Sequence, residues 1–244
     1  MFTIVKLDAI NSTNSFLKEW AKTKLVKNGT VVVAKNQYSG RGQMHNRWRS
    51  EPGKNLTFSL LCRFKNLKSP KQFYLNCAVS AAIYEAIFPI IGNDLSVKWP
   101  NDIMADNKKI GGVLVENTVK NGFITQSIIG IGLNVNQTIF PKDLAQATSL
   151  NLLLKKEFDL DIILTSILSA VPKKFKMLES KMYNELFDFY NKNLYKINVR
   201  ANFIDENEQS FKGKIKGVNS NGALEIELDN KKIKSFAHNT IHFL

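Results

Sequence analysis

The sequence predicts an α+β fold, in which one mixed sheet with flanking helices precedes a small β-barrel. Two observations favour this architecture. Helix-like and strand-like segments come in the order helix, strand, helix and then several strands joined by tight turns, which is not the regular alternation of a βαβ protein. In addition, roughly the last 50 residues contain only short strand-like segments separated by turn sequences, as is typical of a small barrel.

The first half of the chain opens with a predicted helix over residues 11–25, because NSTN is a good N-cap sequence and apolar residues follow it at helical spacing. Runs rich in β-branched and apolar residues predict strands at 29–35 and 55–63, so the sheet holds the loop between them at both ends. A second helix is expected over 70–91, where apolar residues recur at helical spacing between a proline and a glycine.

The rest of the chain is expected to form hairpins, helices and then strands. The turn sequences DNKK and KNG separate strand-like runs, which predicts antiparallel hairpins. We expect one domain over residues 1–192 and a second over 193–244. The expected elements are strands at 95–100, 102–105, 109–118 and 123–135, helices near 143–154 and 159–192, and strands at 195–204, 210–219, 222–229 and 231–236.

The composition is ordinary for a folded protein, with 44% hydrophobic and 23% charged residues. The first residues lack a basic stretch followed by a long apolar one, and apolar runs fall short of the roughly 18 residues that a membrane span needs. A cytoplasmic protein is therefore expected.

Cys62 and Cys77 lie in apolar segments and are expected to be reduced core residues. His45, His238 and His242 are too scattered to suggest zinc, so any metal is expected to arrive with a substrate.

The net charge is +13 at pH 7, from 34 Lys and Arg against 21 Asp and Glu. Such an excess is compatible with a nucleic acid, an anionic cofactor or an acidic protein partner. It is also compatible with an ordinary solvated surface, because much of the excess is lysine spread singly along the chain. The charge alone therefore does not choose between an enzyme and a binding module.

One predicted loop concentrates positive charge. Gly40 and Gly42 flank Arg41, so the backbone can approach a ligand at the point where a guanidinium is presented. Arg47 is a second cation in this loop, and Trp48 is an aromatic residue in an otherwise polar segment. A mobile loop that folds over an anion explains these features, and an ordinary surface loop with incidental arginines is the alternative.

Three further clusters lie on or beside strand-like segments. In KWPND, Asn101 and Asp102 are either plain turn residues or site residues. In KKIGGVLVE, Lys109 comes shortly before two glycines, which indicate a close approach by a ligand or by another backbone. In GIGLNV, two glycines leave room for something flat, with a β-bulge as the alternative, and Asn134 offers an amide.

Taken together and in this order, the motifs resemble those of the biotin protein ligases, a family that adenylates biotin and transfers it to a lysine of a carrier domain. The resemblance extends over roughly residues 7–136 and rests on STN at 12–14, a glutamine at 37 followed by SGRGQMHNRW, and then GKNLTFS, KWPNDI, KKIGGVLVE and GIGLNV. It implies the catalytic fold of class II aminoacyl-tRNA synthetases, followed by an SH3-like barrel. Longer members carry an N-terminal DNA-binding domain, whereas this sequence starts at the catalytic core, so a repressor role is not expected.

The resemblance also implies a reaction and the residues that perform it. Biotin would be activated as biotinyl-5′-AMP with ATP and Mg²⁺, and then transferred to a biotin carboxyl carrier domain of a carboxylase. Because a carboxylate attacks a phosphate in the first step, fixed positive charges are needed. The expected catalytic residues are Lys109, Arg41 and Asp102, with Arg47 as a weaker candidate. The expected biotin-binding residues are Ser12, Thr13, Asn14, Gln37, Gly40, Arg41, Lys109 and Gly112. The expected nucleotide-binding residues are Arg41, Gly42, Gln43, Trp48, Asn101, Lys109 and Asn134.

Met44 and His45 stand where many members of the family have arginine and glycine, from which we expect weaker retention of the adenylate. A lipoate or octanoate ligase of the same fold is the enzymatic alternative, and a non-enzymatic nucleic-acid-binding module is the alternative from another class. Biotin carrier domains tend to be acidic, so the basic charge is expected to speed their encounter with this protein. The resemblance leaves a homodimer open and implies neither DNA nor a membrane as a partner.

Overall fold

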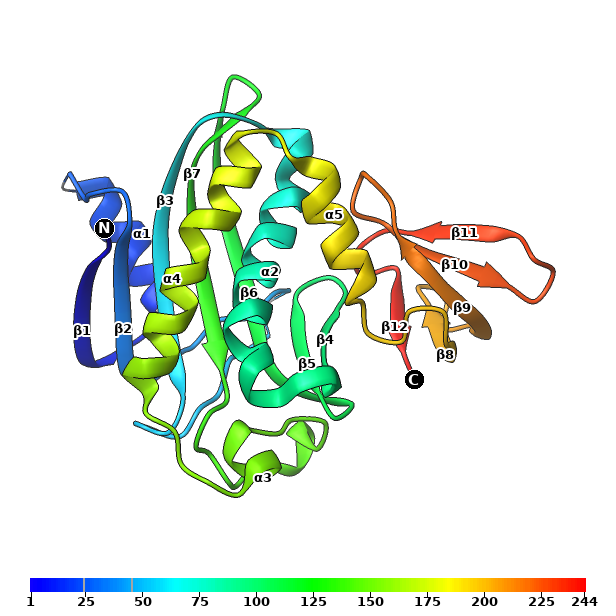
Figure 1. Ribbon diagram of the computed structural model, residues 1–244, viewed down its shortest axis with the longest axis horizontal. Helices are drawn as coiled ribbons and strands as arrows, with labels where there is room; N and C mark the ends of the chain where they lie inside the picture. Colours follow the sequence, from blue (N-terminus) through cyan, green and yellow to red (C-terminus); the bar gives the residue numbers. More distant parts are fainter. Residues whose placement is uncertain (24, 45) are drawn as a thin grey trace.

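A seven-stranded mixed sheet, in the order β1-β2-β3-β7-β6-β5-β4, forms the larger part of the molecule (Figure 1). The computed structural model describes residues 1–23, 25–44 and 46–244, so expectations that involve Lys24 or His45 lie outside the described residues at those two positions. β1 and β2 pair in parallel across α1 (Thr13–Thr23), and the other neighbouring strands pair antiparallel. The strands are β1 (Thr3–Ile10), β2 (Thr30–Gln37), β3 (Leu56–Lys68), β4 (Leu95–Lys98), β5 (Asp102–Ala105), β6 (Lys108–Lys120) and β7 (Phe123–Leu133).

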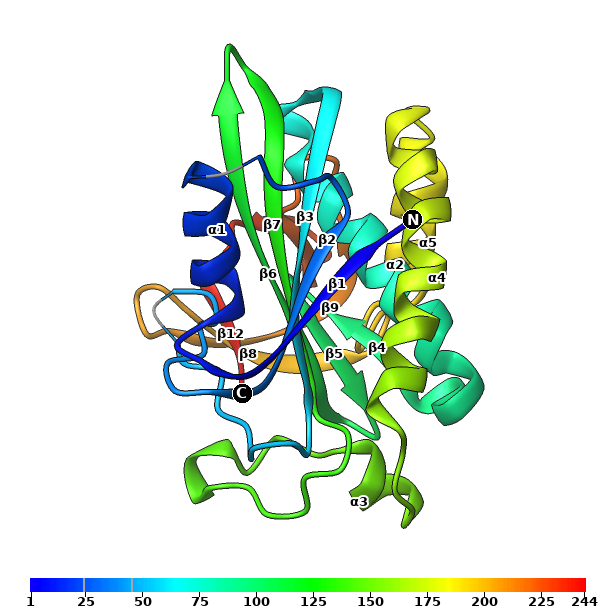
Figure 2. The same ribbon diagram turned by 90° about the vertical axis from the view of Figure 1, so that its left-hand side faces the viewer.

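Helices cover both faces of this sheet. α1 lies against one face, and α2 (Gln72–Ile91), α4 (Leu160–Glu179) and α5 (Tyr183–Lys192) cover the other (Figure 2). By length and composition the helical segment Ser69–Asp94, which contains α2, is apolar enough to span a membrane, and this differs from the sequence expectation. It is the core helix of this fold, because α2 packs against the sheet, α4 and α5 and buries more than half of its side chains.

A second, five-stranded antiparallel sheet follows α5, in the order β11-β10-β9-β8-β12. The predicted α+β class, with a large mixed sheet and a small β-rich C-terminal part, is confirmed. The backbone of residues 193–195 joins the large sheet, since Val97 donates to Asn193 O at 2.8 Å and accepts from Tyr195 N at 2.8 Å. The strands are β8 (Arg200–Asp205), β9 (Ser210–Val218), β10 (Leu224–Leu228), β11 (Ile233–Phe236) and β12 (Ile241–Phe243).

Several predicted elements differ in extent from the observed ones. The helix expected near 143–154 is largely wrong: the structure has a 3-10 turn at Lys142–Leu144 and then α3 (Leu150–Leu154), which begins where the Ser149 side chain accepts from Leu152 N. The helix expected over 159–192 is two helices, because the chain turns at Lys181, whose φ of 59° is left-handed.

The elements near the two ends of the chain also differ from those expected from the sequence. β1 and β12 were not predicted, and β8 begins at Arg200 rather than at residue 195. Cys62 and Cys77, in contrast, are buried free thiols, as expected, and burial raises the pKa of both.

Candidate active site

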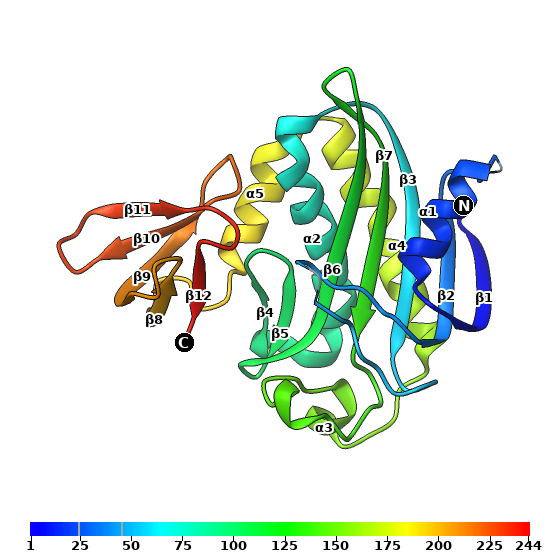
Figure 3. The ribbon, with the colours of Figure 1, turned by 180° about the vertical axis from the view of Figure 1, so that it is seen from behind.

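A cavity of about 350 Å³ lies on the face of the large sheet that carries α1. The segment between β2 and β3 crosses this face in front of β6 and β7 (Figure 3). Most of the predicted site residues line the cavity together, namely Ser12, Thr13, Asn14, Gln37, Arg41, Gly42, Gln43, Trp48, Asn101, Asp102, Lys109 and Gly112. Gly40 and Asn134 are the predicted residues that do not line it.

The start of α1 supplies one polar end of the cavity. Thr13 donates from its backbone N–H at 2.8 Å, and from its hydroxyl at 3.1 Å, to the Gln37 side-chain oxygen. The Ser59 hydroxyl on β3 lies between the Thr13 hydroxyl, at 2.7 Å, and the Asn14 side-chain oxygen. Ser12, Thr13 and Asn14 are each only 3% exposed. These side chains therefore form a buried polar network that is fixed by strands on both sides.

We call residues 40–48 the glycine loop, and in its described part Arg41 and Arg47 form an antiparallel bridge beside the cavity. Trp48 N donates to Gly40 O at 2.9 Å, and Gly42 N donates to Asn46 O at 2.7 Å. A Cβ atom on Gly40 would lie 2.3 Å from Trp48 O, so a side chain there would force the loop apart. Gly40 therefore shapes the loop instead of lining the cavity.

The glycines of β7 make room for the protein's own side chains. A Cβ atom on Gly132 would lie 2.4 Å from the Trp48 indole, and one on Gly130 would lie 2.3 Å from the Asn14 side-chain oxygen. The space beside Gly132, which the sequence suggested could hold a flat group, is thus occupied by the Trp48 indole. The alternative of a β-bulge is wrong here, because β6 and β7 pair in continuous register past Gly112 and Gly132.

The two glycines of β6 have different neighbours. A Cβ atom on Gly111 would lie 2.9 Å from Gly132 O, so this glycine permits a close approach of two strands. A Cβ atom on Gly112 would meet the side chains of Asp102 and Lys109 at an ordinary 3.5 Å, on the cavity side. The approach predicted from sequence is therefore to another backbone at Gly111 and to the cavity at Gly112.

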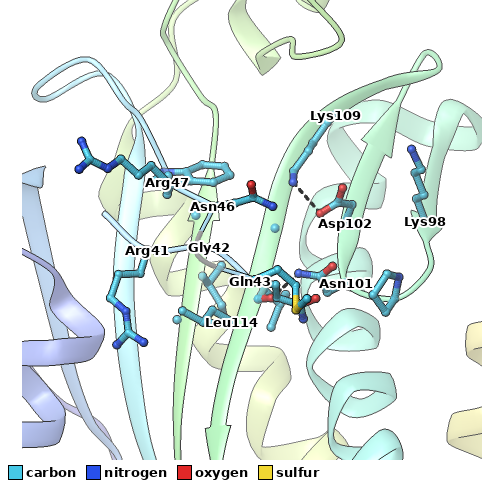
Figure 4. A pocket seen from close by; sticks show the side chains of 18 of the residues that line it. Arg41, Gly42, Gln43, Asn46, Arg47, Lys98, Asn101, Asp102, Lys109 and Leu114 are labelled. Carbon is cyan, nitrogen blue, oxygen red and sulfur yellow. Dashed lines mark hydrogen bonds and ion pairs between the residues drawn. The ribbon is translucent and has the colours of Figure 1, made fainter. Parts of the chain in front are cut away.

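An ion pair stands at the charged end of the cavity. Lys109 Nζ lies 2.6 Å from Asp102 Oδ1, and the two side chains point toward each other from β6 and β5 (Figure 4). Asn101 also borders the cavity, but its side chain donates to Val113 O at 2.6 Å and so fixes the β4–β5 turn. Among the residues that the structure describes, no three His, Cys, Asp or Glu side chains gather as a metal centre would require.

Lys98 is a cavity residue whose role the sequence reasoning did not assign. It precedes Trp99 in KWPND, and its ammonium lies 4.6 Å from the centre of the Phe243 ring. Burial lowers the pKa of Lys98, although the nearby Asp102 carboxylate opposes that shift. The sequence signal for Lys98 was its place in the same motif as Asp102. In the sheet, Lys98 on β4 is separated from Lys109 on β6 by the one strand β5.

Arg41 does not present its charge to the Lys109–Asp102 pair. Its two terminal nitrogens lie 3.1 and 3.3 Å from the two carboxylate oxygens of Glu116 on β6. Arg47 is exposed and borders the cavity, but its guanidinium extends away from the Lys109–Asp102 pair (Figure 4). In this structure Arg41 is therefore held by a carboxylate that lies 75 residues away in sequence, and the roles predicted for Arg41 and Arg47 stay predictions.

Glu116 itself was not singled out by sequence reasoning. Its burial raises the pKa of the carboxyl group, but hydrogen bonds from Lys18 and Asn14 and the charge of Arg41 outweigh that effect, so the pKa is lowered. Glu116 is therefore ionised at neutral pH and balances the cations beside it. The sequence signal that could have identified Glu116 is its position as the last residue of the KKIGGVLVE motif.

Asn134 supports the site from behind. It is 4% exposed, and its side chain donates to Thr148 O at 3.0 Å. Thr148 N in turn donates to Lys109 O at 2.9 Å. Asn134 does not line the cavity, and its amide donates to the segment that runs beside Lys109, so its contact with a nucleotide stays a prediction.

The C-terminal sheet contributes a wall that the sequence did not predict. Trp99 Nε1 donates to Gly222 O at 2.9 Å, and the Asn239 amide lies 3.2 Å from the Met44 sulfur at the tip of the glycine loop. The cavity is thus bounded by both parts of the molecule. The C-terminal residues that line it are His238, Asn239, Ile241, His242 and Phe243.

Two buried polar atoms at the cavity have no partner within the described part of the chain. They are the Trp48 indole nitrogen and the Gln43 side-chain oxygen. Since buried polar groups are nearly always paired, both atoms are suited to contact a bound molecule.

Residues 7–134 match the sequence profile of the Biotin/lipoate A/B protein ligase family. The chain belongs to this family. Among its relatives, the bifunctional ligase/repressor BirA of Bacillus subtilis is 31% identical over 235 residues, which cover 93% of this chain and 71% of BirA. The biotin–[acetyl-CoA-carboxylase] ligase of Mycobacterium tuberculosis is 30% identical over 129 residues, or 52% of this chain and 47% of that ligase.

The fold agrees with this family. The solved structure of the biotin protein ligase from Aquifex aeolicus, in complex with biotin and ATP, superposes with a TM-score of 0.81 and 28% sequence identity. The match covers 99% of this chain and 98% of that one, so it includes the C-terminal sheet. The resemblance noted from the motifs is confirmed.

Proposed function

We infer that this protein is an ATP-dependent biotin protein ligase, which activates biotin as biotinyl-5′-AMP and transfers it to a lysine of a biotin carboxyl carrier domain. The observation that carries this conclusion is the match over nearly the whole chain to a ligase solved with biotin and ATP. The cavity supports it, because a buried polar network occupies one end and a lysine–aspartate pair the other. Neither a lipoate ligase nor a nucleic-acid-binding module is favoured by any contact described here.

We assign the biotin head group to the end of the cavity formed by α1. A ureido ring offers two N–H donors and one carbonyl acceptor, and needs partners of both kinds in a buried site. Ser12, Thr13, Asn14 and Gln37 supply hydroxyls and amides that are already held in place. Gly112 leaves the space beside Lys109 open for the chain that ends in the carboxylate.

The reacting groups belong at the Lys109–Asp102 end. When a carboxylate attacks the α-phosphate, negative charge accumulates and must be stabilised by fixed cations. Lys109 is placed to supply that charge, and Lys98 adds a second cation at the same end. Arg41 pairs with Glu116, away from the Lys109–Asp102 end, so Lys109 is the predicted cation that stands at the end assigned to the reacting groups.

A divalent cation fits the same end of the cavity. Mg²⁺ bound with a nucleotide usually takes most of its oxygen ligands from phosphates and water and one or two from carboxylates. Asp102 is a carboxylate at the cavity and is 22% exposed. We therefore propose that Mg²⁺ enters with ATP and that Asp102 also orients the carrier lysine in the second step.

The second step requires that water be kept from the mixed anhydride until the carrier lysine arrives. The glycine loop spans the cavity and is positioned to close over the adenylate, with Gly42, Gln43 and Trp48 against the nucleotide. Met44 belongs to this loop, and His45 lies outside the described residues. We keep the proposal that this pair retains the adenylate weakly; a slow adenylate release in a chase experiment would refute it.

The test is to incubate the purified protein with biotin, MgATP and a biotin carrier domain and to measure the mass of the carrier. We expect one biotin to be added, and Lys109→Ala to reduce the rate by at least about a hundredfold, because it removes a charge that acts in the transition state. Lys108→Ala is the matched control, since Lys108 is the exposed neighbour outside the cavity. Transfer of lipoate or octanoate instead of biotin would contradict the proposal.

We also propose that the protein acts in the cytoplasm and without DNA as a partner. The packing of α2 against the sheet, α4 and α5 argues against its spanning a membrane. Whether two copies associate is open to a measurement of molecular mass in solution.

A further inference from the structure

Glu116 is bound by side chains from both segments that frame the biotin end of the cavity, although it does not line the cavity itself. We propose that Glu116 is a positioning residue, which locks the start of α1 to the root of the glycine loop and thereby sets how tightly biotin and its adenylate are held. This role rests on the proposed function. It concerns binding and residence, and not the chemical steps.

The contacts of Glu116 come from two directions. From α1, Asn14 Nδ2 donates at 3.1 Å to Oε2 and Lys18 Nζ donates at 2.9 Å to Oε1. From the loop, Arg41 donates to both oxygens, at 3.1 and 3.3 Å. Each carboxylate oxygen thus receives one donor from the helix and one from the loop. The Glu116 side chain is 17% exposed, so these bonds are partly shielded from water.

The first consequence concerns Asn14. Because the Asn14 nitrogen donates to Glu116 and its oxygen meets the Ser59 hydroxyl, the amide has one orientation. Gly130 leaves the room for that oxygen. Without the carboxylate, the donor end of this amide would lose its charged partner, and the cavity would lose a fixed hydrogen-bonding pattern where the ureido ring is assigned.

The second consequence concerns the loop. Arg41 is the first cation of the glycine loop, and a bidentate pair with a carboxylate fixes a guanidinium in position and in plane. The root of the loop is therefore attached to β6, while its tip near Met44 remains 59% exposed. Loss of the attachment would free the root, and the loop would release the adenylate faster.

The geometry separates this role from a catalytic one. Along β6, Glu116 comes two residues after the cavity-lining Leu114 and seven residues after Lys109, and Glu116 itself does not line the cavity. A change at Glu116 should therefore alter the affinity for biotin and the lifetime of the adenylate, and leave the transfer step from bound adenylate unchanged.

The experiment compares wild-type protein with Glu116→Gln and Glu116→Asp. Biotin affinity is measured by calorimetry without ATP, adenylate release by a chase, and transfer by single-turnover reaction of pre-formed enzyme–adenylate with excess carrier. We expect Glu116→Gln to bind biotin about tenfold more weakly and to release the adenylate correspondingly faster, as follows from losing charged hydrogen bonds. Glu116→Asp should recover part of the loss, because it keeps the charge. Single-turnover transfer should stay within about twofold of wild type.

Glu19→Gln is the matched control, because Glu19 is an exposed carboxylate on α1 that pairs with Lys22. A double-mutant cycle with Arg41→Ala tests the mechanism: if Glu116 acts through Arg41, the double variant is close to the worse single variant, and not additive. Thermal unfolding of each variant checks that the fold is intact.

Three results would overturn the inference. They are a Glu116→Gln variant that binds biotin and retains the adenylate like wild type, additive losses in the cycle, and a variant in which transfer falls as much as affinity. These results can be told apart from failure of the proposed function. If the wild-type protein neither binds biotin nor modifies the carrier, the proposed function fails and this inference fails with it. If the wild-type protein is active and Glu116→Gln behaves like it, only the role of Glu116 is removed.

Discussion

The buried charge of Lys98 lowers the stability of the fold, but the same charge is available to bind an anionic ligand in the cavity. Its ammonium is largely removed from water, which lowers its pKa, and the Asp102 carboxylate offsets this only in part. A lowered pKa means that the charged form is less favourable in the folded than in the unfolded protein. The cost is present at neutral pH, decreases as the pH rises through the lowered pKa, and has vanished once the pH exceeds the ordinary lysine pKa of 10.5.

Replacing Lys98 by methionine should therefore raise the melting temperature at pH 7 by a few degrees and weaken ATP binding. We expect the KM for ATP to increase roughly tenfold, because a phosphate contact to a cation would be lost. Thermal unfolding and steady-state kinetics measure the two effects, with Lys108→Met as the exposed control. A lower melting temperature would show that Lys98 stabilises the fold instead.

Single residues were predictable from sequence only where their role is carried by a local motif. The polar start of α1 and the pair Lys109–Asp102 were expected in the site, and the structure brings them to one cavity. The placement of Arg41 was not predictable, because its partner Glu116 reaches it only through the pairing of the sheet. The support that Asn134 gives to Thr148 was not predictable for the same reason, since Thr148 comes from a later segment.

At the scale of elements, α2 and α4 are joined by a buried ion pair. Lys174 on α4 is 5% exposed and pairs with Glu85 on α2, and its ammonium lies 5.0 Å from the centre of the Phe189 ring. Breaking a buried pair leaves one charge without compensation, whereas replacing both partners by apolar residues is often neutral. This pair therefore fixes how the two helices meet more than it stabilises them.

Glu85→Ala should lower the free energy of unfolding by roughly 2 kcal/mol, less than for a fully buried pair because Glu85 is partly exposed. The double variant Glu85→Leu with Lys174→Met should return close to wild type. Denaturant unfolding measures both. Equal losses in the single and double variants would mean that the packing around Lys174, and not its charge, determines the effect.

Elements with a long periodic pattern were predicted well, and short ones were not. α2 and the central strands have many residues that repeat the same signal. β12 has three residues, too few for any periodicity to be seen, and β1 alternates weakly because it is an edge strand with much of its surface exposed. The break between α4 and α5 depends on one left-handed residue, Lys181, which carries no sequence signal for that conformation.

For the whole molecule, the net charge of +13 would attract an acidic carrier domain if such a domain is the partner. Long-range attraction accelerates encounter and is screened by salt within a Debye length of about 10 Å at 0.1 M. The fold class was predictable because it needs only the order of elements. The wall built by the C-terminal sheet was not, because it depends on how two sheets that are separate in sequence are placed.

Transfer to the carrier should therefore slow at least threefold, as an order-of-magnitude estimate, when ionic strength rises from about 0.02 M to about 0.2 M. Adenylate formation, measured without carrier, should change much less because biotin is small and the cations are fixed in the cavity. Initial rates at limiting carrier concentration provide the measurement. Equal salt effects on both steps would exclude steering.

The indole of Trp48, seated over Gly132 at the cavity wall, has a practical consequence. The protein has three tryptophans, and Trp48 and Trp99 both border the cavity, whereas Trp20 packs beside Phe16 on α1. Ultraviolet emission from this chain is therefore weighted toward the place where a ligand would enter. The molecule contains its own optical reporter, and occupancy of the site can be followed in real time without attaching a dye.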